Sequence, residues 1–250
     1  MIQRTTRNNV AILQLNHGKA SAMDLELLEA LRTQLAETAA SDAKAIVITG
    51  TGSIFSAGVD LFRLVEEGAS YVERFFPAMV DAFRELFLFP RPIVAAVNGH
   101  AIAGGAIITA ASDYRIMASG KGRIGVPELL VGVPFPALAL EIVRFGIPPQ
   151  HVQDLIYTSR TITPDEALQR GVVDEIAEPE ALLDRAIGIA VELGSRPRDA
   201  FRLAKRQLRM PFVNRALELA SADREALELW TSPETHASIR AYLDRTIGKK

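Results

Sequence analysis

The sequence has no cysteine, few histidines and little net charge, and each shortage excludes a class of function. Because none of the 250 residues is a cysteine, disulfides, thiolate metal sites and cysteine nucleophiles are excluded. The 4 histidines show no metal-binding spacing. A formal net charge of −2 argues against nucleic acid or an anionic membrane as a general partner.

Long apolar runs are missing as well. No stretch reaches the roughly 18–20 apolar residues that a bilayer-spanning helix needs. The chain enters a strand almost at its N-terminus, without the pattern of a signal or transit peptide, so we expect a cytoplasmic protein. Hydrophobic residues nevertheless make up 48% of the chain, and 250 residues permit one large domain, or one domain with an appendage.

The first fifty residues predict one β-α-β unit. Val10–Leu15 and Ala45–Gly50 are typical of strands. Between them, Ser21 with Asp24 three residues later indicates a helix N-cap and an acidic first turn, and leucines then recur at helical spacing to about Ala40. Such a unit is typical of a parallel sheet with crossover helices.

Gly50-Thr51-Gly52-Ser53 follows the second of these strands. It is either a phosphate-binding loop or a tight turn. Neither a following Lys-Ser/Thr pair nor a third glycine in the dinucleotide pattern is present, so the tight turn is favoured.

The stretch from Arg91 to Glu128 carries the strongest chemical signal. Ile93–Val97 is an unbroken β-branched and alanine run, which predicts a buried strand. Gly104-Gly105 then opens an apolar run that predicts a short buried helix. Glycines at such a turn let backbone N–H groups approach a ligand at the positive end of the helix dipole, which makes an oxyanion site.

Together with Phe55-Ser56-Ala57-Gly58-Val59-Asp60-Leu61 upstream, this stretch resembles the crotonase family, the enoyl-CoA hydratase/isomerase superfamily. The resemblance runs from Leu15-Asn16 to about Glu178. It implies an α/β fold, a crotonase-like spiral of ββα units with a C-terminal helical region that builds a trimer or a dimer of trimers. A composition shift near Arg196 divides the chain into a core domain, residues 1–195, and a helical oligomerisation region, residues 196–250.

The resemblance also implies the ligand and its site. The substrate is an acyl-CoA thioester, and no other cofactor, metal or nicotinamide is expected because CoA is part of the substrate. The implied catalytic positions are Glu128, Val59 and Gly104. The implied substrate-binding residues are Ala20, Ala57, Val59, Asp60, Leu61, Phe62, Gly104 and Gly105, with Lys19 and the terminal Lys249-Lys250 near the phosphates.

The expected chemistry begins with proton removal beside the thioester carbonyl. Two fixed backbone N–H donors, from Val59 and Gly104, would hold the enolate oxygen, and losing one such donor costs on the order of 10²–10³ in rate. Glu128 follows a proline in an apolar stretch, where burial would raise the pKa of its carboxyl toward working pH. Alternatively, Glu128 is a buried ion-pair residue, with Arg115 or Arg123 as its partner.

The reaction is predicted from where the chain departs from the family pattern. Hydratases of the family carry a second glutamate three positions after the second oxyanion glycine, and that position is Ile107 here. The segment Pro134–Ala139 is bulky where hydratases have a glycine-rich turn. A single carboxylate favours an enoyl-CoA isomerase. The alternatives are a hydratase, then a decarboxylase or thioesterase, and finally a non-catalytic acyl-CoA-binding subunit.

Tyr71–Phe89 carries five phenylalanines and is apolar on more than one helical face. Such a helix is either buried on several sides or forms the wall of a wide or long acyl pocket. Further along, Thr163 with Pro164 and Glu166 is typical of a helix start, and Val172–Ala177 of a short strand. Other helices are expected over residues 137–145, 149–157, 182–193, 200–208, 213–229 and 233–246.

Overall fold

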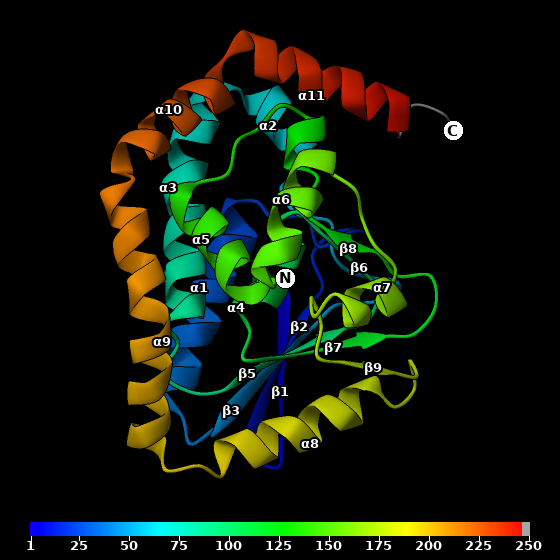
Figure 1. The fold of residues 1–250 in the computed structure, drawn as a ribbon, viewed down its shortest axis with the longest axis vertical. Helices are drawn as coiled ribbons and strands as arrows, with labels where there is room; N and C mark the ends of the chain where they lie inside the picture. The colour runs from blue at the N-terminus through cyan, green and yellow to red at the C-terminus, as the bar shows by residue number, and fades with distance from the viewer. Residues whose placement is uncertain (247–250) are drawn as a thin grey trace.

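A computed structural model describes residues 1–246, and its strands form two sheets (Figure 1). The larger sheet has the order β1-β2-β3-β5-β7-β9, antiparallel between β1 and β2 and parallel elsewhere. Its strands are β1 (Ile2–Arg7), β2 (Val10–Leu15), β3 (Ala45–Thr49), β5 (Ile93–Val97), β7 (Tyr114–Ala118) and β9 (Glu175–Ala177). The smaller sheet is parallel, in the order β4 (Ile54–Ser56), β6 (His100–Ile102) and β8 (Ile124–Gly125).

From β3 to β8, consecutive strands belong alternately to the larger and the smaller sheet. Strand β3 is followed by β4, β5 by β6 and β7 by β8, so each turn adds one strand to each sheet before helical structure returns the chain. The helical elements of successive turns are α2 (Leu61–Glu67) with α3 (Ala69–Phe87), then α4 (Gly104–Ala111), then the 3₁₀ turn η1 (Glu128–Leu130) with α5 (Ala137–Gly146). This confirms the predicted spiral of ββα units.

The first helix has the predicted extent but a different cap. Helix α1 (Leu25–Ala40) joins β2 to β3, which pair in parallel as expected. Its N-cap is Asp24, which accepts a hydrogen bond from Leu27 N–H (2.8 Å), so the assignment of the cap to Ser21 was wrong. The helix begins after Asp24 because a tertiary contact holds the residue before it. Met23 N–H donates to Gly58 O (2.7 Å), on the loop that follows β4.

Each face of the larger sheet is covered by a different layer of helices. Helix α8 (Leu182–Gly194) packs on one face, against side chains such as Val47 and Val94. Alternate residues, such as Ile46 and Ile48, belong to the main core on the other face, with α1 and α3. Figure 1 shows α8 along one side of the sheet and α1, α3 and the tail helix α9 on another. Burial on both faces explains why these strands are continuous apolar runs.

Two short helices connect α5 to the last strand. These are α6 (Pro149–Thr158) and α7 (Pro164–Gln169). Thr163 caps α7 by accepting a hydrogen bond from Glu166 N–H (3.3 Å), as predicted. The segment from Gly50 to Ser53 is a tight turn closed by a bridge between Thr51 and Ile54, also as predicted.

The helical tail is divided differently from the prediction. Helix α9 (Arg198–Glu218) continues through Pro211, where we expected a break, and the chain turns at Leu219 before α10 (Ala220–Thr231) and α11 (Pro233–Thr246). Pro211 is exposed, so the backbone carbonyl that it leaves unpaired can contact water. The buried side of α9 includes two charged residues, which hid the helical period; it consists of Lys205, Arg209, Val213 and Ala216.

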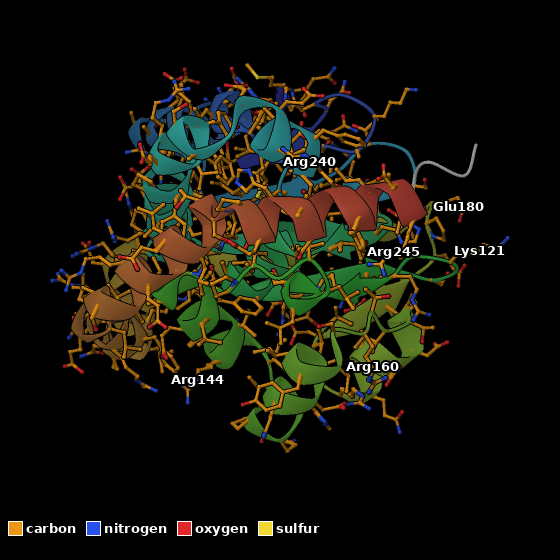
Figure 2. All side chains as sticks on the ribbon, turned by 90° about the horizontal axis from the view of Figure 1, so that it is seen from above. Lys121, Arg144, Arg160, Glu180, Arg240 and Arg245 are labelled. Carbon is orange, nitrogen blue, oxygen red and sulfur yellow. The ribbon has the colours of Figure 1, made fainter. Side chains whose placement is uncertain are left out.

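The tail packs closely on the preceding elements. Helix α9 lies against α5, α10 against α3, and α11 against α2. Figure 2 shows α11 running across this end of the molecule, where Arg240 donates a hydrogen bond to Val65 O of α2 (3.3 Å). Tail residues such as Trp230 and Leu243 belong to the main core. The division at residue 196 and the oligomerisation role of the tail stay predictions.

Candidate active site

Three positions singled out in the sequence follow the three strands of the small sheet. Val59 comes shortly after β4, Gly104 after β6 and Glu128 after β8. Because these strands are parallel, their carboxyl ends meet at one edge of the sheet. Residues far apart in the sequence are therefore brought to the same side of the fold, the side on which open parallel sheets commonly bind ligands.

The backbone N–H groups of Val59 and Gly104 lie at this edge. Neither donates to an acceptor among the described residues. The amides beside Val59 are used: Ala57 N–H donates to Ala20 O (3.0 Å), and Asp60 N–H donates to Met23 O (2.9 Å). The surrounding hydrogen bonds hold the loop in place while the Val59 donor stays available to a ligand.

Gly58 allows the two donor loops to touch. Its φ is +83°, and a Cβ there would lie 2.8 Å from the carbonyl oxygen of Ile102 and 3.1 Å from the amide nitrogen of Gly104. Gly104 is the first residue of α4, where N–H groups are free at the positive end of the helix dipole. Two free donors in contacting loops are the arrangement that stabilises an oxyanion.

Gly105 has a different position from the rest of the predicted substrate-binding set. It does not line the cavity described below. A Cβ on Gly105 would lie 2.5 Å from the carbonyl oxygen of Ser56, so its missing side chain lets α4 pack against β4. The structure therefore gives Gly105 a packing contact, whereas Ala20, Ala57, Val59, Asp60, Leu61, Phe62 and Gly104 all line the cavity.

Glu128 is buried without a charged partner among the described residues. It begins η1, the residue is 8% exposed, and its Oε2 has no hydrogen-bond partner within residues 1–246. Burial raises the pKa of the Glu128 carboxyl to about 8, because water is withdrawn from its charged form. A carboxyl with such a pKa can both accept and donate a proton near neutral pH.

The alternative interpretation of Glu128, a buried ion pair, is wrong. Arg115 pairs with Asp174 (2.7 Å). Arg123 donates instead to Thr161, on the segment before α7. Neither arginine that lies nearby in the sequence therefore neutralises Glu128.

Two other carboxylates near the site are bound in structural contacts. Glu141 is fully buried, but it does not line the cavity, and it pairs with Arg144 (3.1 Å) and Arg215 (3.5 Å). Asp60 does line the cavity, and its side chain caps α2 by accepting from Arg63 N–H (3.1 Å). Glu128 is therefore the carboxylate best placed for proton transfer.

A cavity of about 510 Å³ connects these features. Its mouth includes the exposed Lys19 and Phe62, and its interior includes Glu128, Gly104 and Ile107. Ile107 lies one turn into α4, is 4% exposed, and presents an aliphatic side chain to the same cavity as Glu128. A volume of this size is typical of small-molecule and cofactor sites.

The mouth also contains a histidine that the sequence analysis did not assign to it. His17 lines the cavity, and its Nε2 lies 2.6 Å from Oδ2 of Asp24. Lys19, expected near the phosphates of CoA, lies on the same exposed rim. The other lysines expected there, Lys249-Lys250, lie outside the described residues.

The aromatic helix α3 forms only a small part of the cavity wall. Phe83 and Met79 line the cavity, whereas Phe75, Phe76 and Phe87 do not and are buried in the core. The number of phenylalanines in α3 therefore does not indicate the size of the pocket. Both predictions for this helix, burial in the core and lining of a cavity, are partly right. Helix α3 is buried on several sides, and one strip of it faces the ligand cavity.

The tail contributes to this cavity, which the sequence did not lead us to expect. Four lining residues come from α10 and α11: Trp230, Tyr242, Leu243 and Thr246. No local motif marks them, because they reach the site only through the packing of the tail on α2 and α3. The single tryptophan of the chain was the available signal, since an aromatic residue in a largely polar tail is commonly anchored in a pocket or core.

Neither a membrane-crossing helix nor a cluster of metal-binding side chains is found in the part of the chain that the structure describes. No helix within residues 1–246 combines the length and hydropathy needed to cross a membrane. In the same residues, no group of three or more His, Asp or Glu side chains is placed to hold a metal ion. The expectations of a cytoplasmic location and of no separate cofactor stay predictions.

Comparison with known proteins agrees with this architecture. The family model described as enoyl-CoA hydratase/isomerase matches residues 5–247. The chain is 32% identical to the short-chain-enoyl-CoA hydratase of Clostridium acetobutylicum, over 80% of this chain and 77% of that protein. It is 23% identical to rat mitochondrial enoyl-CoA delta isomerase 1, over 100% of this chain and 88% of that protein.

The fold is also that of solved members of this group. The structure superposes on human mitochondrial delta3-delta2-enoyl-CoA isomerase with a TM-score of 0.94. The match covers 100% of this chain and 99% of the human chain at 22% identity, so it bears on the fold alone.

Proposed function

Because the chain belongs to the enoyl-CoA hydratase/isomerase family, within the crotonase superfamily, we propose that it is an enoyl-CoA isomerase in which Glu128 is the sole acid and base. The observation that carries this proposal is the pairing of two side chains in one cavity. Glu128 is buried with no charged partner in the described part of the chain, and Ile107 occupies the position where the resemblance places the second glutamate of hydratases. Addition of water in such sites uses two cooperating carboxylates, whereas moving a double bond needs one.

The first step is binding of the thioester carbonyl. Its oxygen accepts hydrogen bonds from Val59 N–H and Gly104 N–H, neither of which donates to another described residue. When a proton leaves C2 of a 3-enoyl-CoA, the negative charge spreads onto this oxygen. Donors fixed by the protein, one of them at the start of α4, stabilise that charge without having to reorient.

The second step is proton transfer through Glu128. Its carboxylate takes the proton from C2, and the C–H electron pair becomes part of a dienolate. The carboxylic acid then returns the proton to C4, the double bond forms between C2 and C3, and the carboxylate is regenerated. No proton, electron or group is gained or lost overall, so the reaction needs no co-reactant beyond the acyl-CoA.

The cavity supports proton return rather than water addition. Ile107 offers no hydrogen-bond partner to a water molecule, and the wall beyond Glu128 includes Val131, Val133 and Phe135. A pKa raised to about 8 keeps Glu128 able to act in both directions. Similarity to rat enoyl-CoA delta isomerase 1 over 100% of this chain gives further support.

The assembly prediction is retained as part of this proposal: a trimer, or a dimer of trimers. Exposed apolar side chains that suit a subunit contact lie on α9 and η1; they are Leu203, Leu208, Leu217, Leu129 and Leu130. Light scattering at micromolar concentration is expected to give three or six times the chain mass of 27.2 kDa. A mass near that of one chain would contradict the assembly without bearing on the reaction.

The proposed reaction is tested by two separate assays on the purified protein. We expect 3-enoyl-CoA to be converted to 2-enoyl-CoA, and 2-enoyl-CoA to gain water much more slowly. Hydration of 2-enoyl-CoA well above the rate of isomerisation would overturn the proposal and favour a hydratase. Exchange of the C2 proton without either product would indicate another enolate reaction.

A further inference from the structure

The cavity has an open end and a closed end. Lys19 and Phe62, both exposed, mark the mouth, where the CoA portion of a substrate would leave the protein. At the other end the lining side chains are buried and apolar; they are Met79, Phe83, Ala139 and Trp230. A chain that enters past Glu128 therefore ends against a wall made by α3, α5 and the tail helix α10.

Trp230 is the most firmly held part of this wall. It is 3% exposed, and its Nε1–H donates to Pro134 O (2.8 Å). Behind it, Phe76 packs edge-on at 5.6 Å and Phe75 is stacked at 6.4 Å, both measured between ring centroids. Because its hydrogen bond and its aromatic contacts fix the ring, a longer ligand cannot push it aside without disturbing the core.

We propose that Trp230 sets the length of the acyl chain that the protein accepts, an inference that rests on the proposed acyl-CoA site. The indole ring closes the apolar end of the cavity, and its one polar group is already bound to Pro134. The other side chains of this end have no hydrogen-bond donor or acceptor stronger than the Met79 sulfur. The closed end thus selects an acyl chain that is hydrocarbon to its tip and limited in length by the ring.

Ala139 gives the same wall a second adjustable position. It is 1% exposed and lines the cavity from α5, so a larger apolar side chain there would project into the space for the acyl chain. Shortening the side chain at 230 and enlarging it at 139 should therefore move the preferred chain length in opposite directions. A general loss of stability would not produce opposite shifts.

The test measures binding and turnover with thioesters that lengthen by two carbons at a time. Saturated acyl-CoA binding by calorimetry and 3-enoyl-CoA isomerisation are followed for wild type, Trp230→Leu and Ala139→Leu. Each added methylene should improve wild-type binding about 4-fold while it is buried, until the chain meets the wall. Trp230→Leu should move the optimum to longer chains, and Ala139→Leu to shorter ones.

A third variant separates the ring from its hydrogen bond. Trp230→Phe keeps an aromatic wall but removes the donor to Pro134 O, so its optimum should move less than that of Trp230→Leu. An unchanged optimum of binding in both Trp230→Leu and Ala139→Leu would overturn the inference. Shifted binding optima in a protein that does not isomerise 3-enoyl-CoA would support the wall and contradict only the proposed reaction.

Discussion

Two carboxylates removed from solvent, Glu128 and Asp113, lie in contrasting surroundings. Oε2 of Glu128 has no hydrogen-bond partner within residues 1–246, and its carboxyl faces the cavity. The Asp113 side chain, 12% exposed, accepts hydrogen bonds from Lys205 Nζ (2.6 Å), Arg209 Nη2 (2.7 Å) and Ile93 N–H (2.8 Å). At Glu128 the effect of burial outweighs that of a backbone hydrogen bond and raises the pKa of the carboxyl to about 8.

The difference separates a structural carboxylate from a chemical one. Asp113 holds α9 in place, because Lys205 and Arg209 of this helix donate to its carboxylate. Arg209 adds hydrogen bonds to the carbonyls of Phe87 (2.6 Å) and Ala111 (2.8 Å). Two cations neutralise the Asp113 carboxylate, and three donors occupy its oxygens, so it is not available to bind or deprotonate a substrate. Of these two acids, Glu128 faces the cavity with an unmet hydrogen bond, and it is the one whose protonation can change during a reaction.

The largest effect is expected from removing the charge of Glu128. Glu128→Gln keeps the shape of the side chain but cannot take a proton, so isomerisation should fall by roughly 10²–10⁴, the range typical of general acid–base catalysis. Steady-state rates with 3-enoyl-CoA measure this, and calorimetry with a saturated acyl-CoA should show nearly unchanged binding. Near-full activity of Glu128→Gln would place the base elsewhere, with Asp60 the next candidate in the cavity.

The same kind of change at Asp113 should affect stability instead. Asp113→Asn leaves Lys205 and Arg209 buried without a counter-charge, and breaking a buried ion pair costs about 3–5 kcal/mol of unfolding free energy. Urea unfolding measures the loss, while the folded fraction should keep its rate. Asp174→Asn is the matched control, because its pair with Arg115 is partly exposed and should cost about 1 kcal/mol or less. Equal losses of unfolding free energy in Asp113→Asn and Asp174→Asn would contradict a special structural role for Asp113.

The pH dependence of the rate should follow the ionisation of Glu128. Its carboxylate is the reactive base, so kcat/KM should rise about tenfold per pH unit below pH 8 and level off above it. Stability should run the other way. The folded state keeps the Glu128 proton between the ordinary pKa of 4.5 and about 8, so unfolding free energy from this group falls as pH rises through that window.

Glu128→Gln should remove the decrease in unfolding free energy that Glu128 causes between pH 4.5 and about pH 8. At pH 8 the variant should melt at a higher temperature than wild type, and at pH 4.5 the two should nearly coincide. A wild-type rate that levels off near pH 5, or equal melting temperatures at pH 8, would show that Glu128 titrates normally.

The smallest effect on isomerisation is expected when a second carboxylate is placed beside the first. Ile107→Glu removes no group that the proposed reaction uses, so isomerisation should stay within about tenfold of wild type once pH is raised to ionise both acids. Hydration of 2-enoyl-CoA should increase if a water is now held between them. Ile107→Gln is the matched uncharged control. A loss as large as that of Glu128→Gln would contradict a purely aliphatic role for Ile107.

Much of this account could be predicted from the sequence, because the deciding features are local. β-branched runs identify β3 and β5, Thr163 with Pro164 marks the start of α7, and the glycines at 58 and 104 lie where two loops must touch. The burial of Glu128 was also predictable from its apolar neighbours. The lack of a charged partner among the described residues was not predictable, because Arg115 and Arg123, although near in sequence, contact Asp174 and Thr161, which lie just before β9 and α7.

The features that could not be predicted depend on tertiary packing. Strands β4, β6 and β8 are two or three residues long, too short to show a period. The helical period of α9 was hidden because two charged residues, Lys205 and Arg209, lie on its buried side beside Asp113. Trp230 reaches the cavity only because α10 folds back on α3.

The central claim is that one carboxyl group removes the proton and returns it. It is tested most directly by a single turnover of 3-enoyl-CoA deuterated at C2, with the position of the label in the product read by mass spectrometry or NMR. Because Glu128 is buried, we expect its proton to exchange with water more slowly than it is returned to the substrate, so part of the deuterium should appear at C4 of the 2-enoyl-CoA. A product with no deuterium at C4, formed while the label leaves C2, would contradict it.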